Sequence, residues 1–301
     1  MYDIIVIGAG PAGLTAAIYG RRANKKVLVL EASNYGGQII NTLDIENYPG
    51  ENHISGYDLA QKIYDQAKSL GAEIKYEKVI DLNDYKESKE VITSNNTYST
   101  KTVIIATGSK TKSLGIDNEE NLIGKGISYC ATCDGAFYKN RDVAVIGGGS
   151  RAVEDAIYLS DIANKVYLIC RKDKLSAPEL YIDKLFKKNN IEIVYESNIS
   201  SINGEEVLSS IDIVNNNDEK RNIKISGLFI AIGRIPENNN FIKYVDINKN
   251  GYIIANENCQ TKTPGIFVAG DTREKELRQL VTATSDGAIA ASEAIKYING
   301  K

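Results

Sequence analysis

The feature that most constrains the fold is a pattern of strand, glycine-rich turn, helix and strand that occurs twice in the 301 residues. The first copy predicts strands over 2–7 and 26–30, joined by a helix from about residue 11 to residue 23. The second copy predicts strands over 142–146 and 165–169, again joined by a helix. Such a βαβ unit forms the core of a dinucleotide-binding domain, so the repeat predicts an α/β protein with two Rossmann-like domains and parallel sheets.

The first glycine turn has the G-x-G-x-x-G spacing, and its second strand ends on the acid Glu31. Glycines at these positions allow a tight turn and a close backbone approach, the helix N-terminus faces a pyrophosphate, and the acid accepts from ribose hydroxyls. Glycine turns also join strands and helices for packing alone, but the ordered series favours a dinucleotide. Because Glu31 would repel a 2′-phosphate, this unit is expected to bind FAD or NAD(H). The candidate contacts are Gly8, Gly10, Pro11, Ala12, Gly13, Glu31 and Ala32.

Other segments are expected at the edge of the same cofactor site. A glycine loop at 36–39 and the ends of apolar strands at 103–106 and 265–271 would lie at the ligand edge of a parallel sheet. The final helix, expected from about Arg278 to Tyr297, would place its positive N-terminal end near a reduced flavin ring, or would simply pack as an amphipathic helix. The candidates are Gly37, Gln38, Ile39, Asn47, Ala106, Thr107, Gly108, Gly270, Asp271, Arg278, Gln279 and Leu280.

The second glycine turn differs at the end of its second strand, where Arg171 and Lys172 follow Cys170 in place of an acid. Two cations at that position accommodate a 2′-phosphate, so this unit is expected to bind NADP(H); a solvated basic turn is the alternative. A strand expected over 225–232 ends at Gly233 and Arg234. The candidate contacts are Gly147, Gly149, Ser150, Arg171, Lys172, Gly233 and Arg234.

Further β-structure is expected outside the two repeats. The segments 74–79 and 89–94 predict a small β-meander, and a helix precedes them at about 57–70. The segment 191–214 predicts a strand and hairpin region with a turn at 215–218. One more strand is expected near 252–255.

A C-x-x-C sequence, Cys130 to Cys133, carries the candidate chemistry, and Asp134 follows it directly. Two cysteines at this spacing can close a small disulfide ring, and an adjacent acid can give a proton to a leaving thiolate. A structural zinc site would need four nitrogen or sulfur ligands. The remaining Cys170, Cys259 and His53 stand at isolated positions, so redox exchange is favoured, no metal site is expected, and His53 is expected to be solvated.

Charge and cysteine content limit the classes of function. The net charge of −3 gives no general basic surface for nucleic acid or for an anionic membrane. The N-terminus runs directly into a strand and no apolar run reaches the length of a membrane span, so a cytoplasmic protein is expected. Four cysteines in such a protein suit one working dithiol and two buried free thiols.

These motifs, in this order and spacing, resemble the low-molecular-weight thioredoxin reductases over essentially the whole chain. The resemblance implies an FAD domain at 1–112 and 241–301, interrupted at 113–240 by an NADPH domain that carries the cysteine pair. It implies a homodimer that reduces thioredoxin or a thioredoxin-like protein. It also implies that Cys133 lies nearest the flavin, that Asp134 is the proton donor, and that the inserted domain rotates.

The chain departs from the family pattern after the second repeat. The family usually has His-Arg-Arg and a third arginine there, whereas this chain has Cys170, Arg171, Lys172 and then Ser176. A lysine binds phosphate as a point charge rather than through a bidentate fork. NADH or ferredoxin as electron donor is therefore an alternative. Two further alternatives are independent of this departure: another thiol or disulfide partner, and a nucleotide-binding redox sensor or scaffold without turnover.

Overall fold

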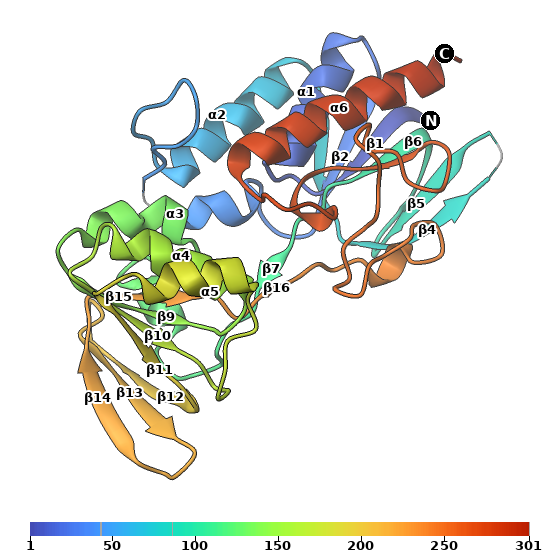
Figure 1. Ribbon diagram of the computed structural model, residues 1–301. Coiled ribbons are helices and arrows are strands. Elements are labelled where there is room, and N and C mark those ends of the chain that lie inside the picture. The colour runs from blue at the N-terminus through green and yellow to red at the C-terminus, as the bar shows by residue number, and fades with distance from the viewer. Residues whose placement is uncertain (43, 86, 301) are drawn as a thin grey trace. The chain divides into compact units, whose positions relative to one another are not determined.

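The chain forms two compact units, which the computed structural model describes over residues 1–42, 44–85 and 87–300, with only the backbone of Asn41 described (Figure 1). Unit 1 comprises Met1–Lys110 and Ile235–Lys301, and unit 2 comprises Thr111–Arg234. The unit boundaries lie after residues 110 and 234, whereas the sequence analysis expected them after residues 112 and 240.

Two short strands carry the chain from one unit to the other and back. They are β7 (Lys110–Thr111) and β16 (Arg234–Ile235), and they pair with each other in a two-stranded sheet. Unit 2 is therefore a continuous segment of the chain, and unit 1 is formed by the two segments that flank it.

A parallel sheet forms the centre of unit 1, with strand order β3-β2-β1-β6 and β17 paired to the C-terminal half of β6. The register sets Ile5 of β1 beside Leu28 of β2 and Val103 of β6. This arrangement confirms the expected strands at 2–7 and 26–30, while of the expected strand at 265–271 only residues 266–268 are a strand and a 3-10 turn begins at Gly270. The strands are β1 (Tyr2–Ile7), β2 (Val27–Glu31), β3 (Glu73–Tyr76), β6 (Thr97–Ile105) and β17 (Ile266–Val268).

An antiparallel meander extends this sheet through β4 (Val79–Asp84), β5 (Lys89–Thr93) and the N-terminal half of β6. The expectation that residues 74–79 belong to the meander is wrong for most of that segment. Residues 74–76 belong to β3, which pairs in parallel with β2 because the preceding helix returns the chain to the same edge of the sheet, and only Val79 lies in the meander, at the start of β4. The strand expected at 252–255 is also wrong, because Ile253 makes only isolated bridges.

Three helices cover one face of the sheet in unit 1. Alternate residues of a strand face opposite sides, so Ile4 and Val6 pack with the helices while Ile5 and Ile7 pack with the meander and the segment that contains Ile253. The helices are α1 (Pro11–Arg22), α2 (Gly56–Ser69) and α6 (Leu280–Ile298), and the 3-10 turns of this unit are η1 (Gly37–Asn41), η4 (Asn239–Phe241) and η5 (Gly270–Thr272).

The final helix begins at Leu280, not at Arg278 as expected. Gln279 is its N-cap residue and forms a capping box with Thr282, so that its backbone is extended rather than helical. Side by side with α1 in Figure 1, α6 approaches closely because Gly287 has no side chain: a Cβ there would lie 2.2 Å from the carbonyl oxygen of Ala12.

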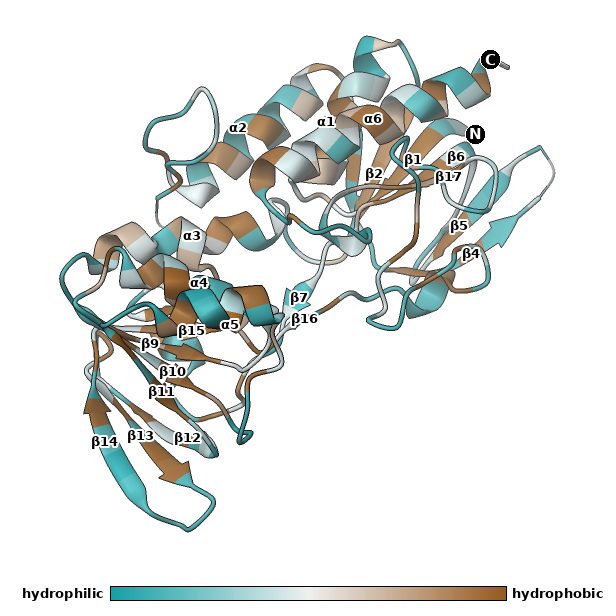
Figure 2. Cartoon of the chain, in the orientation of Figure 1, coloured by the Kyte–Doolittle hydropathy of each residue, from teal (hydrophilic) through white to brown (hydrophobic). Residues whose placement is uncertain are grey.

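Unit 2 repeats the plan with a sheet of five parallel strands in the order β11-β10-β9-β15-β8. Figure 2 shows the hydrophobic residues of its inner strands, which are buried on both faces. The expected strands at 142–146 and 165–169 are confirmed. The strands are β8 (Ile127–Ser128), β9 (Asp142–Ile146), β10 (Lys165–Ile169), β11 (Ile191–Val194) and β15 (Gly227–Ile230).

Helices cover one face of this second sheet, and a three-stranded antiparallel meander covers the other. The turn expected at 215–218 joins the last two strands of the meander. Among the described residues no helix is long and apolar enough to cross a membrane. The remaining elements are η2 (Glu120–Leu122), α3 (Ala131–Asp134), η3 (Gly135–Tyr138), α4 (Ser150–Ser160), α5 (Glu179–Phe186), β12 (Ser197–Asn203), β13 (Ser210–Asn215) and β14 (Lys220–Lys224).

Candidate active site

The cysteine pair lies at the start of the one-turn helix α3 in unit 2. Cys130 and Cys133 form a disulfide, and their Cα atoms are 5.3 Å apart. The carbonyl oxygen of Cys130 accepts hydrogen bonds from the backbone N–H groups of Cys133 at 3.2 Å and Asp134 at 3.1 Å. Both cysteines are half-buried, so the turn closes the ring while leaving it partly accessible. The other two cysteines, Cys170 and Cys259, are buried and free, as expected.

Asp134 ends α3 with its carboxyl group turned toward Ser128, the last residue of β8. The Ser128 hydroxyl donates to Asp134 Oδ2 at 2.6 Å, and it accepts from the backbone N–H of Cys130 at 3.0 Å. Burial raises the pKa of Asp134, while the hydrogen bond from Ser128 opposes the rise. A raised pKa lets a carboxyl group hold its proton at a higher pH than an ordinary aspartate, which suits it to giving and taking protons in thiol exchange.

Tyr138 forms an apolar wall beside this acid. Its ring packs edge-on against Phe229 with ring centroids 5.3 Å apart, and a Cβ at Gly227 would lie 2.6 Å from the ring. Burial, followed by the charge of Asp134, raises the pKa of Tyr138 to about 12. Tyr138 therefore stays neutral over the pH range in which the acid and the thiols exchange protons.

The first glycine turn, in unit 1, needs glycine for steric reasons. Gly8 has a φ of +108°, and a Cβ there would lie 2.4 Å from the carbonyl oxygen of Ala106. A Cβ at Gly13 would lie 1.9 Å from the carbonyl oxygen of Gly8. Gly10 is the N-cap of α1 and no side chain caps the helix, so the first N–H groups of α1 remain available for a phosphate.

Glu31 ends β2 beside this turn. Its Oε2 accepts from the backbone N–H of Ala9 at 2.8 Å and its Oε1 accepts from that of Ser33 at 2.9 Å, and the exposed Ala32 lies between the two contacts. An uncapped helix N-terminus with an acid beside it fits the pyrophosphate and ribose of a dinucleotide without a 2′-phosphate.

Most other expected residues of the first site meet at the carboxyl edge of the same sheet. Asn47 donates to the side chain of Gln279 at 3.3 Å, Thr107 donates to Thr272 at 3.1 Å, and Arg278 donates to the carbonyl oxygen of Asp271 at 3.3 Å. A Cβ at Gly37 would lie 3.3 Å from the Cα of Gly10, so the glycine loop adjoins the first turn. The others are Pro11 and Ala12 in α1, Gln38 and Ile39 in η1, Ala106 and Gly108 after β6, Gly270 in η5 and Leu280 in α6.

The sequence analysis missed Asp286, a buried acid on α6. Its carboxylate accepts from the backbone N–H of Gly270 at 3.0 Å and from Arg273 Nη1 at 3.0 Å, and it also binds Lys275. The three charged side chains are at least nine-tenths buried. Its position between Ala283 and Ala290, three and four residues away, places it on the buried stripe of the helix, and that spacing is the signal that could have revealed it.

The second glycine turn, in unit 2, has a similar geometry. Gly147 has a φ of +143°, and a Cβ there would lie 2.6 Å from the carbonyl oxygen of Ala231. Gly149 caps α4 without a side-chain cap, and no atom lies within 4 Å of the Cβ that it lacks. The space in front of Ser150, the first residue of α4, is therefore open to a phosphate.

The residues expected to bind a 2′-phosphate follow β10. Arg171 and Lys172 are both exposed. Ser176 donates to the carbonyl oxygen of Gly148 through its hydroxyl at 3.1 Å and through its backbone N–H at 2.7 Å. Ser176 thus holds the loop that begins with Arg171 and Lys172 against the glycine turn.

Gly233 and Arg234 end unit 2. The charge of Arg234 acts on a buried acid, Asp155, that the sequence analysis did not single out. Asp155 on α4 accepts from Arg151 Nε at 3.0 Å. Burial raises the pKa of Asp155, and the charges of Arg151 and Arg234 oppose the rise. Its i, i+4 spacing from Arg151 is visible in the sequence, but its burial is not.

His53 lies in an exposed loop of unit 1, where a solvated side chain was expected. It does have an orienting partner: its Nδ1 lies 2.8 Å from Asp44 Oδ2 and 3.6 Å from Glu46 Oε1. The bond to Asp44 raises the pKa of His53. Since the imidazole is 69% exposed, the cluster is a solvated ion-pair group.

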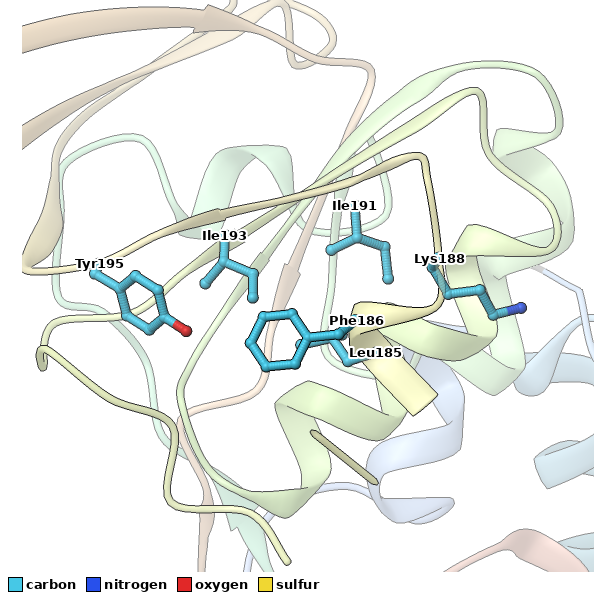
Figure 3. Close-up of a pocket in the computed structure, with 6 residues that line it drawn as sticks. All are labelled: Leu185, Phe186, Lys188, Ile191, Ile193 and Tyr195. Carbon is cyan, nitrogen blue, oxygen red and sulfur yellow. The ribbon is translucent and has the colours of Figure 1, made fainter. Parts of the chain in front are cut away.

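A cavity of about 310 Å³ lies in unit 2 between the end of α5 and the edge strand β11 (Figure 3). Apolar side chains supply most of its lining, and no residue predicted for either nucleotide site or for the cysteine pair takes part. Its lining residues are Leu185, Phe186, Lys188, Ile191, Ile193 and Tyr195.

The two-unit fold and the cysteine pair define a class of protein, and the similarity of this chain to known proteins identifies that class. The sequence pattern described as "Pyridine nucleotide-disulphide oxidoreductase" matches residues 2–287, and the chain belongs to that family. Flavin and pyridine-nucleotide binding and oxidoreductase chemistry on a disulfide belong to this class.

Within that family several relatives are named thioredoxin reductases, so the expected resemblance is confirmed. The chain is 43% identical to the thioredoxin reductase of Listeria innocua, over 99% of this chain and 94% of that protein. The crystal structure of thioredoxin reductase from Streptococcus pyogenes matches with a TM-score of 0.95 at 40% identity, covering 100% of this chain and 99% of that one. A Clostridium pasteurianum relative, 45% identical over 99% of this chain and 98% of its own length, is described as a 34.2 kDa protein in the rubredoxin operon.

Proposed function

We propose that this protein is a thioredoxin-disulfide reductase that passes electrons from NADPH through FAD and the Cys130–Cys133 pair to a thioredoxin or thioredoxin-like disulfide. The observation that carries the proposal is the half-buried Cys130–Cys133 disulfide next to the buried carboxyl group of Asp134. A disulfide with a proton donor beside it suits reversible exchange rather than structural crosslinking.

The two glycine turns support a separate nucleotide for each unit. FAD would be held in unit 1 by the uncapped N-terminus of α1, by Glu31 and by the residues gathered at the carboxyl edge of its sheet. NADPH would be held in unit 2 by the open N-terminus of α4 and by Arg171 and Lys172. When bound, the flavin supplies two-electron transfer between the nicotinamide and the disulfide.

The protein's own residues perform thiol exchange and proton transfer. After reduction of the pair, one cysteine attacks a sulfur of the partner's disulfide as a thiolate and forms a mixed disulfide. The other cysteine then attacks the enzyme sulfur of that mixed disulfide, which restores the Cys130–Cys133 bond and releases the partner dithiol. Asp134 takes the proton from the attacking thiol and gives a proton to the departing thiolate.

One specific observation favours an electron donor other than NADPH as the alternative. Ser176 stands where the family's third arginine is expected, and its hydroxyl is bound to the carbonyl oxygen of Gly148. NADH or ferredoxin is therefore the alternative donor, and another thiol or disulfide protein is the alternative partner. A panel of NADPH, NADH and reduced ferredoxin, each with thioredoxin and with a second disulfide protein, separates these functions.

We also propose a homodimer that works in the cytoplasm. The dimer is supported by the family resemblance. The cytoplasmic setting is supported by the two buried cysteines that remain free, since a reducing compartment keeps such thiols reduced.

Replacing either member of the cysteine pair tests the relay. Cys130→Ser and Cys133→Ser are each expected to keep bound flavin and diaphorase activity toward an artificial acceptor. Each is expected to lose thioredoxin reduction by about a thousandfold or more, because one sulfur cannot complete the exchange. The measurement is steady-state thioredoxin reduction alongside dye reduction.

Cys259→Ala is the matched control because it removes a buried thiol outside the pair. It is expected to retain thioredoxin reduction. If either serine variant reduces thioredoxin at the parental rate, the dithiol relay is wrong.

A further inference from the structure

The hydroxyl group of Ser128 links the cysteine turn to the acid beside it. Ser128 Oγ lies 2.6 Å from Asp134 Oδ2 and 3.0 Å from the backbone nitrogen of Cys130. The serine is only 4% exposed, so water does not compete for these bonds. A hydroxyl group has one proton to donate and two lone pairs that accept. Ser128 can therefore donate to the carboxyl group while it accepts from the N–H of Cys130.

We propose that Ser128 is a positioning residue that holds Asp134 Oδ2 as an acceptor, so that the proton exchanged with the cysteine sulfurs is carried on Oδ1. This inference rests on the proposed function, in which Asp134 exchanges that proton. Among the described residues Oδ1 has no hydrogen-bond partner, although it is buried. Negative charge on an unpartnered buried oxygen costs more than a neutral hydroxyl group there, so the proton is favoured on this oxygen.

In the part of the chain that the structure describes, Ser128 makes the polar contact that distinguishes Asp134 Oδ2 from Oδ1, and the other groups around this acid do not. Tyr138 on η3 stays neutral, because burial raises its pKa to about 12, and the charge of Arg141 acts on that tyrosine. On α4 the ring of Tyr158 packs against the glycine that ends α3. Among the described residues, burial and the Ser128 hydrogen bond are the causes that shift the pKa of Asp134. The two cysteines, which become thiols once the disulfide is reduced, lie one and four residues before this acid in the chain.

The electrons and protons of the exchange balance without a further reactant. Oxidation of the enzyme dithiol forms one S–S bond and releases two protons, and reduction of the partner breaks one S–S bond and takes up two protons. Asp134 Oδ1 carries one of these protons between the enzyme and the departing partner sulfur. Ser128 keeps its own proton throughout, which makes it a positioning residue rather than a catalytic one.

The test is the pH dependence of a single turnover. Reduced protein is mixed with excess thioredoxin disulfide from about pH 5 to about pH 8, and the rate of dithiol oxidation is fitted for the Asp134 midpoint. Ser128→Ala removes a hydrogen bond that favours the charged carboxylate, so the midpoint is expected to rise by about one pH unit. Ser128→Thr keeps a hydroxyl group and is expected to keep the parental midpoint.

Two controls isolate the contact. Ser160→Ala removes another buried serine hydroxyl of unit 2, one that donates to the carbonyl oxygen of Ile157, and is expected to leave the midpoint unchanged. In the Asp134→Asn variant the pH dependence of dithiol oxidation is expected to lack the Asp134 midpoint. Adding Ser128→Ala to that variant is expected to leave the pH dependence unchanged.

The outcomes separate the inference from the proposed function. If the parent does not reduce the disulfide, the function fails. If the parent is active and Ser128→Ala keeps the parental midpoint, the inference is overturned.

If Ser128→Ala does not fold, as shown by the loss of a cooperative unfolding transition, the inference is tested on the folded parent protein instead. The measurement is then the infrared frequency of the carbonyl band of protonated Asp134. That band is identified by its loss in Asp134→Asn. A frequency typical of a carbonyl that accepts a hydrogen bond supports the inference, and the frequency of a free carbonyl contradicts it.

Discussion

At the scale of single residues, the proposed preference of unit 2 for NADPH rests on two exposed side chains. Arg171 and Lys172 follow β10 at the start of the loop that Ser176 holds against Gly148. Charge rather than burial must therefore supply any preference for a 2′-phosphate, because neither cation is fixed by the protein core.

Changing Arg171 and Lys172 together to alanine tests that preference. The KM for NADPH is expected to rise about tenfold, since two charge-assisted contacts are lost, with little change in the KM for NADH. Initial rates with each nucleotide are the measurement. The matched control is the double change of Lys220 and Arg221 on β14, a second exposed Lys–Arg pair, and equal effects on both nucleotides would remove the 2′-phosphate argument.

At the scale of elements, α6 is joined to the turn η5 by charge as well as by packing. Asp286 receives one backbone N–H and two cations from the segment 270–275. Arg278 adds to the same turn: its guanidinium lies 3.9 Å from the ring centroid of Tyr252, and it donates to the carbonyl oxygens of Asp271 and Arg273. The start of α6 and the end of β17 are thus fixed together at the edge where the flavin is proposed to bind.

Asp286→Ala is expected to destabilise unit 1 by about 3 kcal/mol, because it leaves two buried cations without their counter-charge. Denaturant unfolding measures the change. Asp246→Ala serves as the control, since its ion pair with Lys262 is exposed and is expected to be worth less than about 1 kcal/mol. Equal losses in the two variants would show that the buried group has no special role in stability.

At the scale of the whole molecule, each unit has its own hydrophobic cores. Both cores of unit 2 are built from residues between Leu114 and Ile232, on the helix face and the meander face of one sheet. Both cores of unit 1 join its two chain segments across β6 and β17. A continuous segment with complete cores satisfies the conditions for independent folding.

The segment 111–234, produced alone, is expected to fold, to unfold cooperatively on heating and to form the Cys130–Cys133 disulfide. It is also expected to bind no flavin, because the residues proposed for FAD belong to unit 1. Circular dichroism, size-exclusion chromatography and thiol titration are the measurements. A fragment with no thermal transition would mean that unit 2 depends on unit 1 for its fold.

The amino-acid sequence was sufficient for the features that depend on neighbouring residues. Both glycine turns, the strands beside them and the cysteine pair were predicted correctly, because positive φ angles, continuous runs of apolar residues and the C-x-x-C spacing are local properties. The start of α6 was misplaced by two residues, since Gln279 caps the helix instead of entering it.

Only the tertiary structure decided the contacts between distant segments. In the folded protein β3 lies in the parallel sheet rather than in the meander, Asp286 accepts from the backbone N–H of Gly270, and the Ser128 hydroxyl donates to Asp134. Each of these depends on how strands and helices pack, which buries particular polar atoms and thereby selects their partners. The sequence alone thus determined which local units the chain builds and which chemistry it carries, while packing decided which oxygen of the acid is free to hold a proton.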